Sequence, residues 1–165
     1  MLETDRFYLR RFVASDLPHL IELESDSEIL QYITNGIAHS EEMIKIRLDK
    51  LIAEAPAQEP LGVWGAWQKN DDEFVGWFML RYYERFPEPE LGFMIVKRHW
   101  GKGYTFEIAK RLVDLARELK IQSVVAITHA ENIASIRVLE KNQFKFEKVV
   151  ELPNGPANLY RLNLS

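Results

Sequence analysis

The sequence predicts an α+β domain with a mixed, mostly antiparallel sheet of about seven strands flanked by about four helices. Strand-like alternation with a turn signal runs from Leu61 to Tyr83, which indicates adjacent antiparallel strands. A strand, helix, strand, helix passage from Glu90 to Lys141 then implies a parallel crossover. The chain closes with two strands around the turn Pro153-Asn154-Gly155-Pro156.

The first two elements are expected to be a strand and a helix. Apolar and basic residues alternate from Leu2 to Phe12, which suits a strand. Ser15 and Asp16 provide a helix cap, and the apolar residues behind them share one face. This helix is expected to end near Asp26.

A second helix is expected to begin at Ser40, because a serine followed by two glutamates is a common helix start. Its apolar residues recur at helical spacing. Pro56 and Pro60 are expected to stop it. From Leu61 the period becomes that of strands, with a hairpin turn at Asn70-Asp71-Asp72.

The second half of the chain alternates strands and helices. The expected elements are a strand from Glu90 to Val96, a helix from Gly101 to Lys120, a strand from Ser123 to Thr128 and a helix from Asn132 to Lys141. Two last strands are expected near 144–151 and 158–164. No repeat or linker interrupts this order, so residues 1–165 are expected to form a single domain.

Composition excludes several classes of protein. The hydrophobic share of 47% and charged share of 28% are those of a soluble globular protein. The absence of cysteine excludes disulfides, thiolate zinc sites and cysteine nucleophiles, and the four histidines show no ligand spacing, so no metal is expected. A net charge of -4 disfavours nucleic-acid binding. With no apolar run near the roughly 18 residues of a membrane span and no signal peptide, a cytoplasmic location is expected.

A basic, glycine-containing turn stands between the fourth predicted strand and the long helix. Gly101 and Gly103 lack the β-carbon that would keep a ligand from the main chain, so N–H groups at the helix start can approach an anion. Arg98 and Lys102 add positive charge, and the helix dipole has the same sign. The turn is therefore predicted to hold a phosphate-bearing ligand such as a coenzyme.

Two familiar phosphate motifs do not fit this turn. A Walker loop would need a serine or threonine after Lys102, where Gly103 stands. A dinucleotide-binding fingerprint would need a third glycine at the position of Phe106.

The segment Arg98-His99-Trp100-Gly101-Lys102-Gly103 does match R-x-x-G-x-G, the phosphate-binding motif of the GCN5-related N-acetyltransferases, the GNAT family. Residues 3–12 resemble the opening T-x-R-L-x-L-R of the ribosomal-protein alanine N-acetyltransferase branch, which is RimJ/RimL-like, and residues 26–33 resemble its helix after the first turn. The segments 90–93 and 132–141 follow in the order of the family. The resemblance covers nearly the whole chain.

This resemblance implies the GNAT fold, acetyl-CoA as the acetyl donor and a primary amine as the acceptor, either a protein N-terminus or a small amine. It implies direct attack without a covalent enzyme intermediate, and a monomer or homodimer. Two main-chain N–H groups of the strand at 90–96 would bind pantetheine and the thioester oxygen. The coenzyme-binding residues that it implies are Met94, Ile95, Val96, Arg98, His99, Trp100, Gly101, Lys102, Gly103, Tyr104, Thr105, Asn132 and Arg137.

Three residues are candidates for the chemistry. Glu90 matches the family's frequent base position, where burial would raise its pKa toward neutrality and a water would bridge to the amine. Asn132 would orient a catalytic water or bind pantetheine, besides capping its helix. Ser135 would hydrogen-bond or protonate the departing sulfur, or its small side chain would only leave space at this position. Glu84 and Glu88 are alternative bases, and together with Glu90 they predict an acidic pocket mouth that attracts a protonated amine.

The sequence also departs from the family. Leu139 stands where many relatives carry a tyrosine that protonates the leaving thiolate, and Gln143 stands where they carry a glycine. Thr105-Phe106 replaces the commoner Ala-Thr. The missing tyrosine favours an alternative, a non-catalytic acyl-CoA-binding or sensor module, and the acceptor amine is left open.

Overall fold

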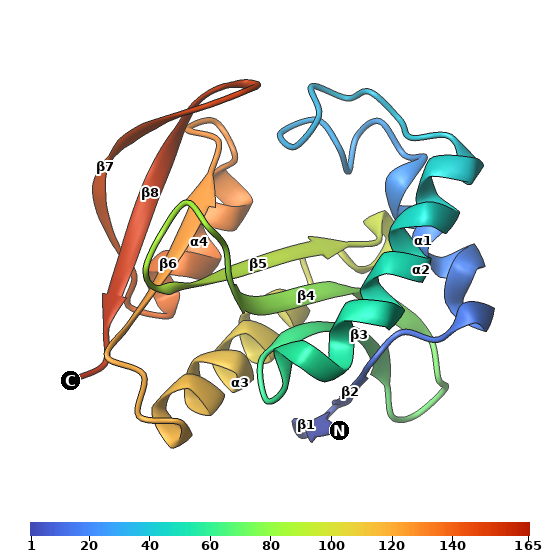
Figure 1. Ribbon diagram of the computed structural model, residues 1–165, viewed down its shortest axis with the longest axis horizontal. Coiled ribbons are helices and arrows are strands. Elements are labelled where there is room, and N and C mark those ends of the chain that lie inside the picture. The colour runs from blue at the N-terminus through green and yellow to red at the C-terminus, as the bar shows by residue number, and fades with distance from the viewer.

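The computed structural model describes residues 1–165 as one eight-stranded sheet flanked by four α-helices (Figure 1). The strands are β1 (Leu2–Glu3), β2 (Phe7–Arg10), β3 (Gly62–Gln68), β4 (Phe74–Tyr82), β5 (Pro89–Ile95), β6 (Ser123–Thr128), β7 (Lys145–Leu152) and β8 (Gly155–Asn163). The helices are α1 (Leu17–Glu24), α2 (Glu41–Gln58), α3 (Tyr104–Glu118) and α4 (Ile133–Lys141), with short 3-10 turns at Ala14–Asp16 and Lys97–His99. The predicted α+β class is confirmed. The eighth strand arises because the first predicted strand divides into β1 and β2.

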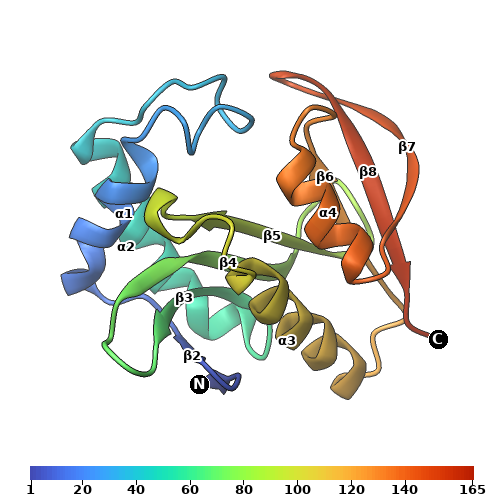
Figure 2. The same ribbon diagram turned by 180° about the vertical axis from the view of Figure 1, so that it is seen from behind.

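The strands lie in the order β1-β2-β3-β4-β5-β6-β8-β7, and every neighbouring pair is antiparallel except β5 and β6. These two parallel strands pair at one position only, Glu90 with Val125, and then separate, as Figures 1 and 2 show. The sheet is therefore open at its centre, beside the chain segment that carries the glycine turn.

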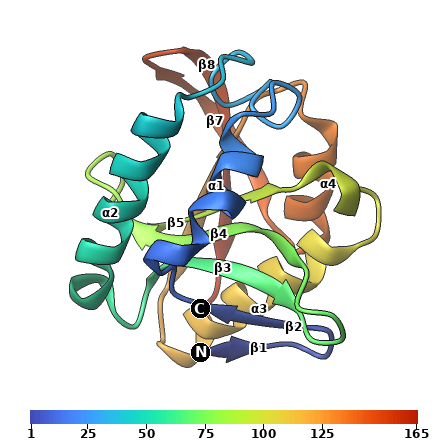
Figure 3. The ribbon, with the colours of Figure 1, turned by 90° about the vertical axis from the view of Figure 1, so that its right-hand side faces the viewer.

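Helices cover both faces of the sheet. Figure 3 shows α1 and α2 on one side, with α3 and α4 on the other. Apolar residues of α3 such as Ile108 and Leu112 are fully buried and form the face of that helix that packs on the strands. Leu20 of α1 and Ile44 of α2 belong to a second buried cluster on the opposite face. No helix combines the length and apolar character that crossing a membrane requires.

The second helix differs from its prediction at its end. Ser40 caps α2 as expected, accepting a 3.2 Å hydrogen bond from the Met43 N–H. Pro56 lies inside the helix, however, which continues to Gln58. A proline removes one donor and crowds the preceding turn, but this close to the end little of the helix remains to be disrupted. Only Pro60, beyond the helix, marks the boundary.

The segment between α1 and α2 is also different from its prediction. Residues 26–33 form successive turns rather than a helix. The Asp26 carboxylate accepts the Glu28 N–H at 2.9 Å and thereby closes the first of them. Such local hydrogen bonding by an aspartate competes with regular helix. Asn35 and Gly36 then adopt positive φ values of 56° and 78° and turn the chain toward α2.

Candidate active site

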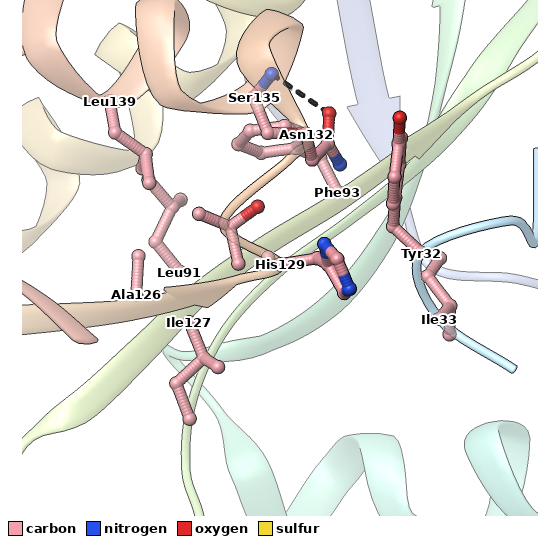
Figure 4. Close-up of a pocket in the computed structure, with 12 residues that line it drawn as sticks. Tyr32, Ile33, Leu91, Phe93, Ala126, Ile127, His129, Asn132, Ser135 and Leu139 are labelled. Carbon is pink, nitrogen blue, oxygen red and sulfur yellow. Dashed lines mark hydrogen bonds between the residues drawn. The ribbon is translucent and has the colours of Figure 1, made fainter. Parts of the chain in front are cut away.

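A cavity of about 90 Å³ lies where β5 and β6 separate. Tyr32 and Ile33 approach it from the turns between α1 and α2, so that segments distant in sequence close it together (Figure 4). The lining residues are Tyr32, Ile33, Leu91, Gly92, Phe93, Ala126, Ile127, Thr128, His129, Asn132, Ser135 and Leu139. The Tyr32 and His129 rings stand 5.2 Å apart at one side of it.

The edge of β5 presents main-chain groups to this gap. The Val96 N–H donates to the Val75 carbonyl of β4 at 3.0 Å, and alternate residues of an antiparallel strand face the same neighbour. Met94 and Val96 therefore direct their main-chain groups to β4. Phe93 and Ile95 direct theirs to the opposite side, beyond the single pair that joins β5 to β6. The gap thus has main-chain hydrogen-bonding groups along one wall.

The glycine turn supplies a second set of N–H groups. Gly101 and Gly103 have φ values of +73° and +76°, which glycine adopts without strain, and a β-carbon on either would meet no atom within 4 Å. Gly103 is the N-cap of the 15-residue helix α3, so the N–H groups of its first turn have no partner within the helix. Lys102 is exposed beside them. The turn fits a phosphate group in shape and charge.

Arg98 is turned away from this loop. Its guanidinium donates to the Phe74 carbonyl at 3.2 Å and pairs with Glu22 of α1, while its Nε lies 3.7 Å from Glu73. Two carboxylates thus balance its charge. In this arrangement Arg98 ties the turn to the opposite face of the sheet.

The next two residues fix the position of the turn. His99 is buried, and burial together with Arg98 and Lys102 lowers the pKa of its imidazole, which is therefore neutral near pH 7. Its Nε2 lies 3.1 Å from a Glu73 carboxylate oxygen without hydrogen-bond alignment. Trp100 is 46% exposed, and its indole N–H donates to the Ile95 carbonyl at 2.9 Å.

The remaining predicted coenzyme residues lie on α3 and α4. The Tyr104 hydroxyl donates to Gln68 at 2.9 Å, so its side chain packs into the core while its main chain stays in the first turn of α3. Thr105 is half-buried beside it. Arg137 is exposed on α4 and makes no ion pair.

Asn132 and Ser135 meet at the start of α4. The Asn132 side-chain oxygen accepts the Ser135 N–H at 3.2 Å, which caps the helix as predicted (Figure 4). Both residues line the cavity. Leu139, one turn further along α4, is buried and also lines it, so no side chain at that position offers a proton.

Glu90 lies on the opposite face of β5. Because side chains alternate along a strand, Glu90 shares the α1 and α2 face with Met94, whereas Leu91 and Phe93 point toward α3 and α4. The Glu90 carboxyl is buried, and this burial raises its pKa, although the Arg85 guanidinium opposes the shift. The structure therefore does not bring Glu90 into the cavity with Asn132 and Ser135.

The pocket mouth is not the acidic surface that the sequence predicted. Glu90 pairs with Arg85 at 2.9 Å, and Glu88 pairs with Arg161 of β8. Only Glu84 is exposed without an ion pair. Four aromatic residues of the central strands are buried in the core: Trp64, Trp67, Trp77 and Phe78.

Sequence reasoning missed four residues at the site. Phe93 could have been found by counting alternate positions back from the glycine turn, since its main chain faces the gap. Arg85 could have been identified as a positively charged residue only five positions before Glu90. No local sequence pattern indicated Tyr32 or His129, because the contact between their rings depends on how two distant segments of the chain pack.

Comparison with known proteins gives the site a context. Residues 6–145 match the acetyltransferase (GNAT) domain family. The uncharacterized N-acetyltransferase YnaD of Bacillus subtilis is 27% identical over 143 residues, which cover 85% of this chain and 79% of YnaD. The uncharacterized protein YkkB of the same organism is 32% identical over 103 residues, and the match covers 61% of this chain and 60% of YkkB.

Solved structures show the same fold. A GNAT-family acetyltransferase from Bacillus anthracis superposes with a TM-score of 0.85 at 23% identity, over 99% of this chain and 98% of the other. The acetyl transferase of Salmonella typhimurium that modifies the N-terminal serine of the 50S ribosomal subunit protein L7/L12 gives 0.79 at 19% identity, over 98% and 97% of the two chains. With its family match across most of the sequence and its open central sheet, the chain belongs to the GNAT family of acetyltransferases.

Proposed function

We propose that the protein transfers an acetyl group from acetyl-CoA to a primary amine by direct attack, with Glu90 as the general base. One observation carries the proposal. β5 presents free main-chain groups and leads into the glycine turn, and the same strand holds a buried carboxyl on its other face. The acetyl donor on one side of β5 and the amine acceptor on the other can therefore meet across this strand.

The donor site follows the path of the chain. The coenzyme pyrophosphate would lie on the N–H groups of residues 101–105, with Lys102 beside it. Pantetheine would run along the edge of β5 at Phe93 and Ile95, facing Asn132 across the gap. Trp100 would close the turn against β5, and the exposed Arg137 of α4 would add positive charge for the phosphates.

The chemistry needs few groups. The amine nitrogen attacks the thioester carbonyl carbon, and its proton passes to Glu90. Glu90 stands three residues from Phe93, about 10 Å along the strand, so the proton passes along a chain of water molecules rather than through a direct contact. The Phe93 N–H faces the position where the carbonyl oxygen gains negative charge. The carbon–sulfur bond then breaks, and the thiolate takes a proton from water, either directly or relayed through the Ser135 hydroxyl, which gives up one proton and regains another.

The acceptor is a protein N-terminus or a small amine. The N-terminal likeness to the RimJ/RimL branch and the fold shared with the Salmonella enzyme support the first. A second function, a non-catalytic acyl-CoA sensor, is favoured by Leu139, which leaves no tyrosine to protonate the thiolate, and by the guanidinium of Arg85 on Glu90.

Thiol release from acetyl-CoA tests the proposal. The purified protein is offered peptides with varied N-termini, amino acids and polyamines, while calorimetry measures binding of coenzyme A. We expect turnover that falls strongly in Glu90→Gln and is unchanged in Glu84→Gln, which alters an exposed neighbour. Coenzyme binding without turnover on any amine would overturn the enzymatic proposal in favour of the sensor.

A further inference from the structure

The surroundings of Glu90 are unusually rich in arginine. Arg85 donates to both carboxylate oxygens, from Nη2 at 2.9 and 3.0 Å and from Nε at 3.2 Å. Arg81 stands directly opposite Glu90 in the register of β4 and β5. Directly opposed residues of an antiparallel pair have β-carbons about 5 Å apart, so both cations adjoin one carboxyl group.

Tyr83 holds the two guanidinium groups together. The guanidinium carbon of Arg81 lies 4.3 Å from the Tyr83 ring centre, and that of Arg85 lies 4.8 Å from it. Arg81 also donates to the Tyr83 hydroxyl. Both guanidinium groups are therefore in contact range of one aromatic ring, and this cation–π attraction offsets part of the cost of placing two like charges near it.

The charges in this cluster do not cancel. Arg81, Arg85 and an ionised Glu90 together leave one positive charge. Glu88 pairs with Arg161 through one carboxylate oxygen, and its other oxygen is buried without a hydrogen-bond partner. The Arg81 Nε is buried and has no hydrogen-bond partner. A buried donor without a partner is costly, and it indicates that another acceptor belongs beside it.

The same contacts obstruct the proposed base. While Arg85 occupies both oxygens of Glu90, the carboxylate has little capacity left to accept a proton. Arg85 is half-exposed on the connection between β4 and β5, and it can therefore turn toward a different anion without disturbing the core.

We propose that the acceptor carries a carboxylate close to its amine, and that Arg85 and Arg81 bind this carboxylate. The inference rests on the proposed function, because it names the substrate class of the same site. When the acceptor binds, Arg85 exchanges Glu90 for the carboxylate of the acceptor, and Glu90 is released to take the proton of the amine. Free amino acids and peptides with an acidic residue share this chemistry. Polyamines are disfavoured, because they would face two guanidinium groups.

Calorimetry on product analogues tests the binding step directly, with coenzyme A present. N-acetylserine is compared with N-acetylserinamide, and the peptide N-acetyl-Ser-Glu-amide with its Ser-Gln counterpart. In the unchanged protein the acid of one pair is expected to bind about 10- to 100-fold more tightly than its amide, the effect of a charge-assisted bidentate contact. The pair that shows the difference distinguishes a free amino acid from a peptide.

The variant Arg85→Gln is expected to bind acid and amide within about threefold of each other. Arg111→Gln, which removes a half-buried arginine paired with Glu118 on α3, is the matched control and should keep the preference. Equal binding of acid and amide by the unchanged protein, weak binding of all four compounds included, would overturn the inference. So would a preference that survives in Arg85→Gln. If thiol release from acetyl-CoA is observed with amines that carry no carboxylate, the proposed acetyltransferase activity holds even though this inference fails.

Discussion

The indole N–H of Trp100 donates a 2.9 Å hydrogen bond to the main-chain carbonyl of Ile95, and this bond joins the glycine turn to the open edge of β5. The two proposed parts of the coenzyme site, one for phosphate and one for pantetheine, are thereby held at a fixed spacing. Trp100 is 46% exposed, so the contact contributes little to the core.

The change Trp100→Phe keeps an aromatic ring and removes the donor. Loss of this bond is expected to free the turn from β5 and weaken coenzyme A binding about fivefold, while the melting temperature falls by only about 2 to 4 °C, since one hydrogen bond is worth about 1 kcal/mol. Calorimetry and a thermal melt measure the two effects. A large drop in stability with unchanged affinity would show that the bond serves the fold alone.

Gly103 combines a left-handed conformation with an open approach to its main chain. The change Gly103→Ala strains the backbone by about 1 to 2 kcal/mol and places a methyl group where the proposed phosphate lies, so coenzyme affinity should fall at least about tenfold. Gly155, which also has a positive φ and open space, is the matched control in the distant β7–β8 turn. Gly155→Ala should lower stability and spare binding. Equal affinity losses in both variants would argue against a phosphate site at Gly103.

Much of this site could be predicted because its signals are local. The glycine turn needs two conformationally free residues at fixed spacing, and the cap of α4 needs an asparagine before an apolar helix, so both are visible in sequence. The strand at Ser123–Thr128 was predicted with its observed bounds, because β-branched residues flanked by polar ones leave little choice.

Other features depend on contacts between distant segments. Arg98 resembles a phosphate ligand in sequence, but Glu22 and Glu73 approach it only after α1 and the β3–β4 turn have packed. The pairing of Glu90 with Arg85 is similar, since the sequence showed three nearby glutamates and predicted an acidic mouth. Residues 26–33 form turns, in which the Asp26 side chain competes for main-chain donors, an outcome that the resemblance to a helix of the family did not reveal.

The proposed base predicts a specific pH dependence. Burial raises the pKa of Glu90, and Arg85 opposes this to a smaller extent. Because the reaction needs the deprotonated carboxylate, the acidic limb of kcat/KM should lie above the pH at which an ordinary glutamate titrates. Arg85→Gln removes the opposing cation and should move the limb further upward. Profiles of kcat/KM against pH, recorded with an amine acceptor that carries no carboxylate, measure the acidic limb in the unchanged protein and in Arg85→Gln. An acidic limb at the same pH in both proteins would exclude Glu90 as the base.

Glu90→Gln should lower kcat by about 10² to 10³ while leaving the KM for acetyl-CoA unchanged, since the donor site lies on the other side of the strand. The exposed change Glu84→Gln controls for loss of negative charge in this loop. If the KM for acetyl-CoA also rises in Glu90→Gln, the substitution has damaged β5 rather than only removed a base.

Asn132 combines two roles that a pair of substitutions can separate. Its side-chain oxygen caps α4 by accepting the Ser135 N–H, while its amide group faces the cavity. Asn132→Asp keeps the cap and removes the amide donors, whereas Asn132→Ala removes both. The alanine variant should therefore lose about 1 kcal/mol of unfolding free energy and the aspartate variant almost none. Both should raise the KM for acetyl-CoA, because both lose the amide that the proposal sets against pantetheine. A normal KM in Asn132→Asp would reduce Asn132 to a helix cap and leave Ser135 as the only polar side chain that α4 itself presents to the cavity.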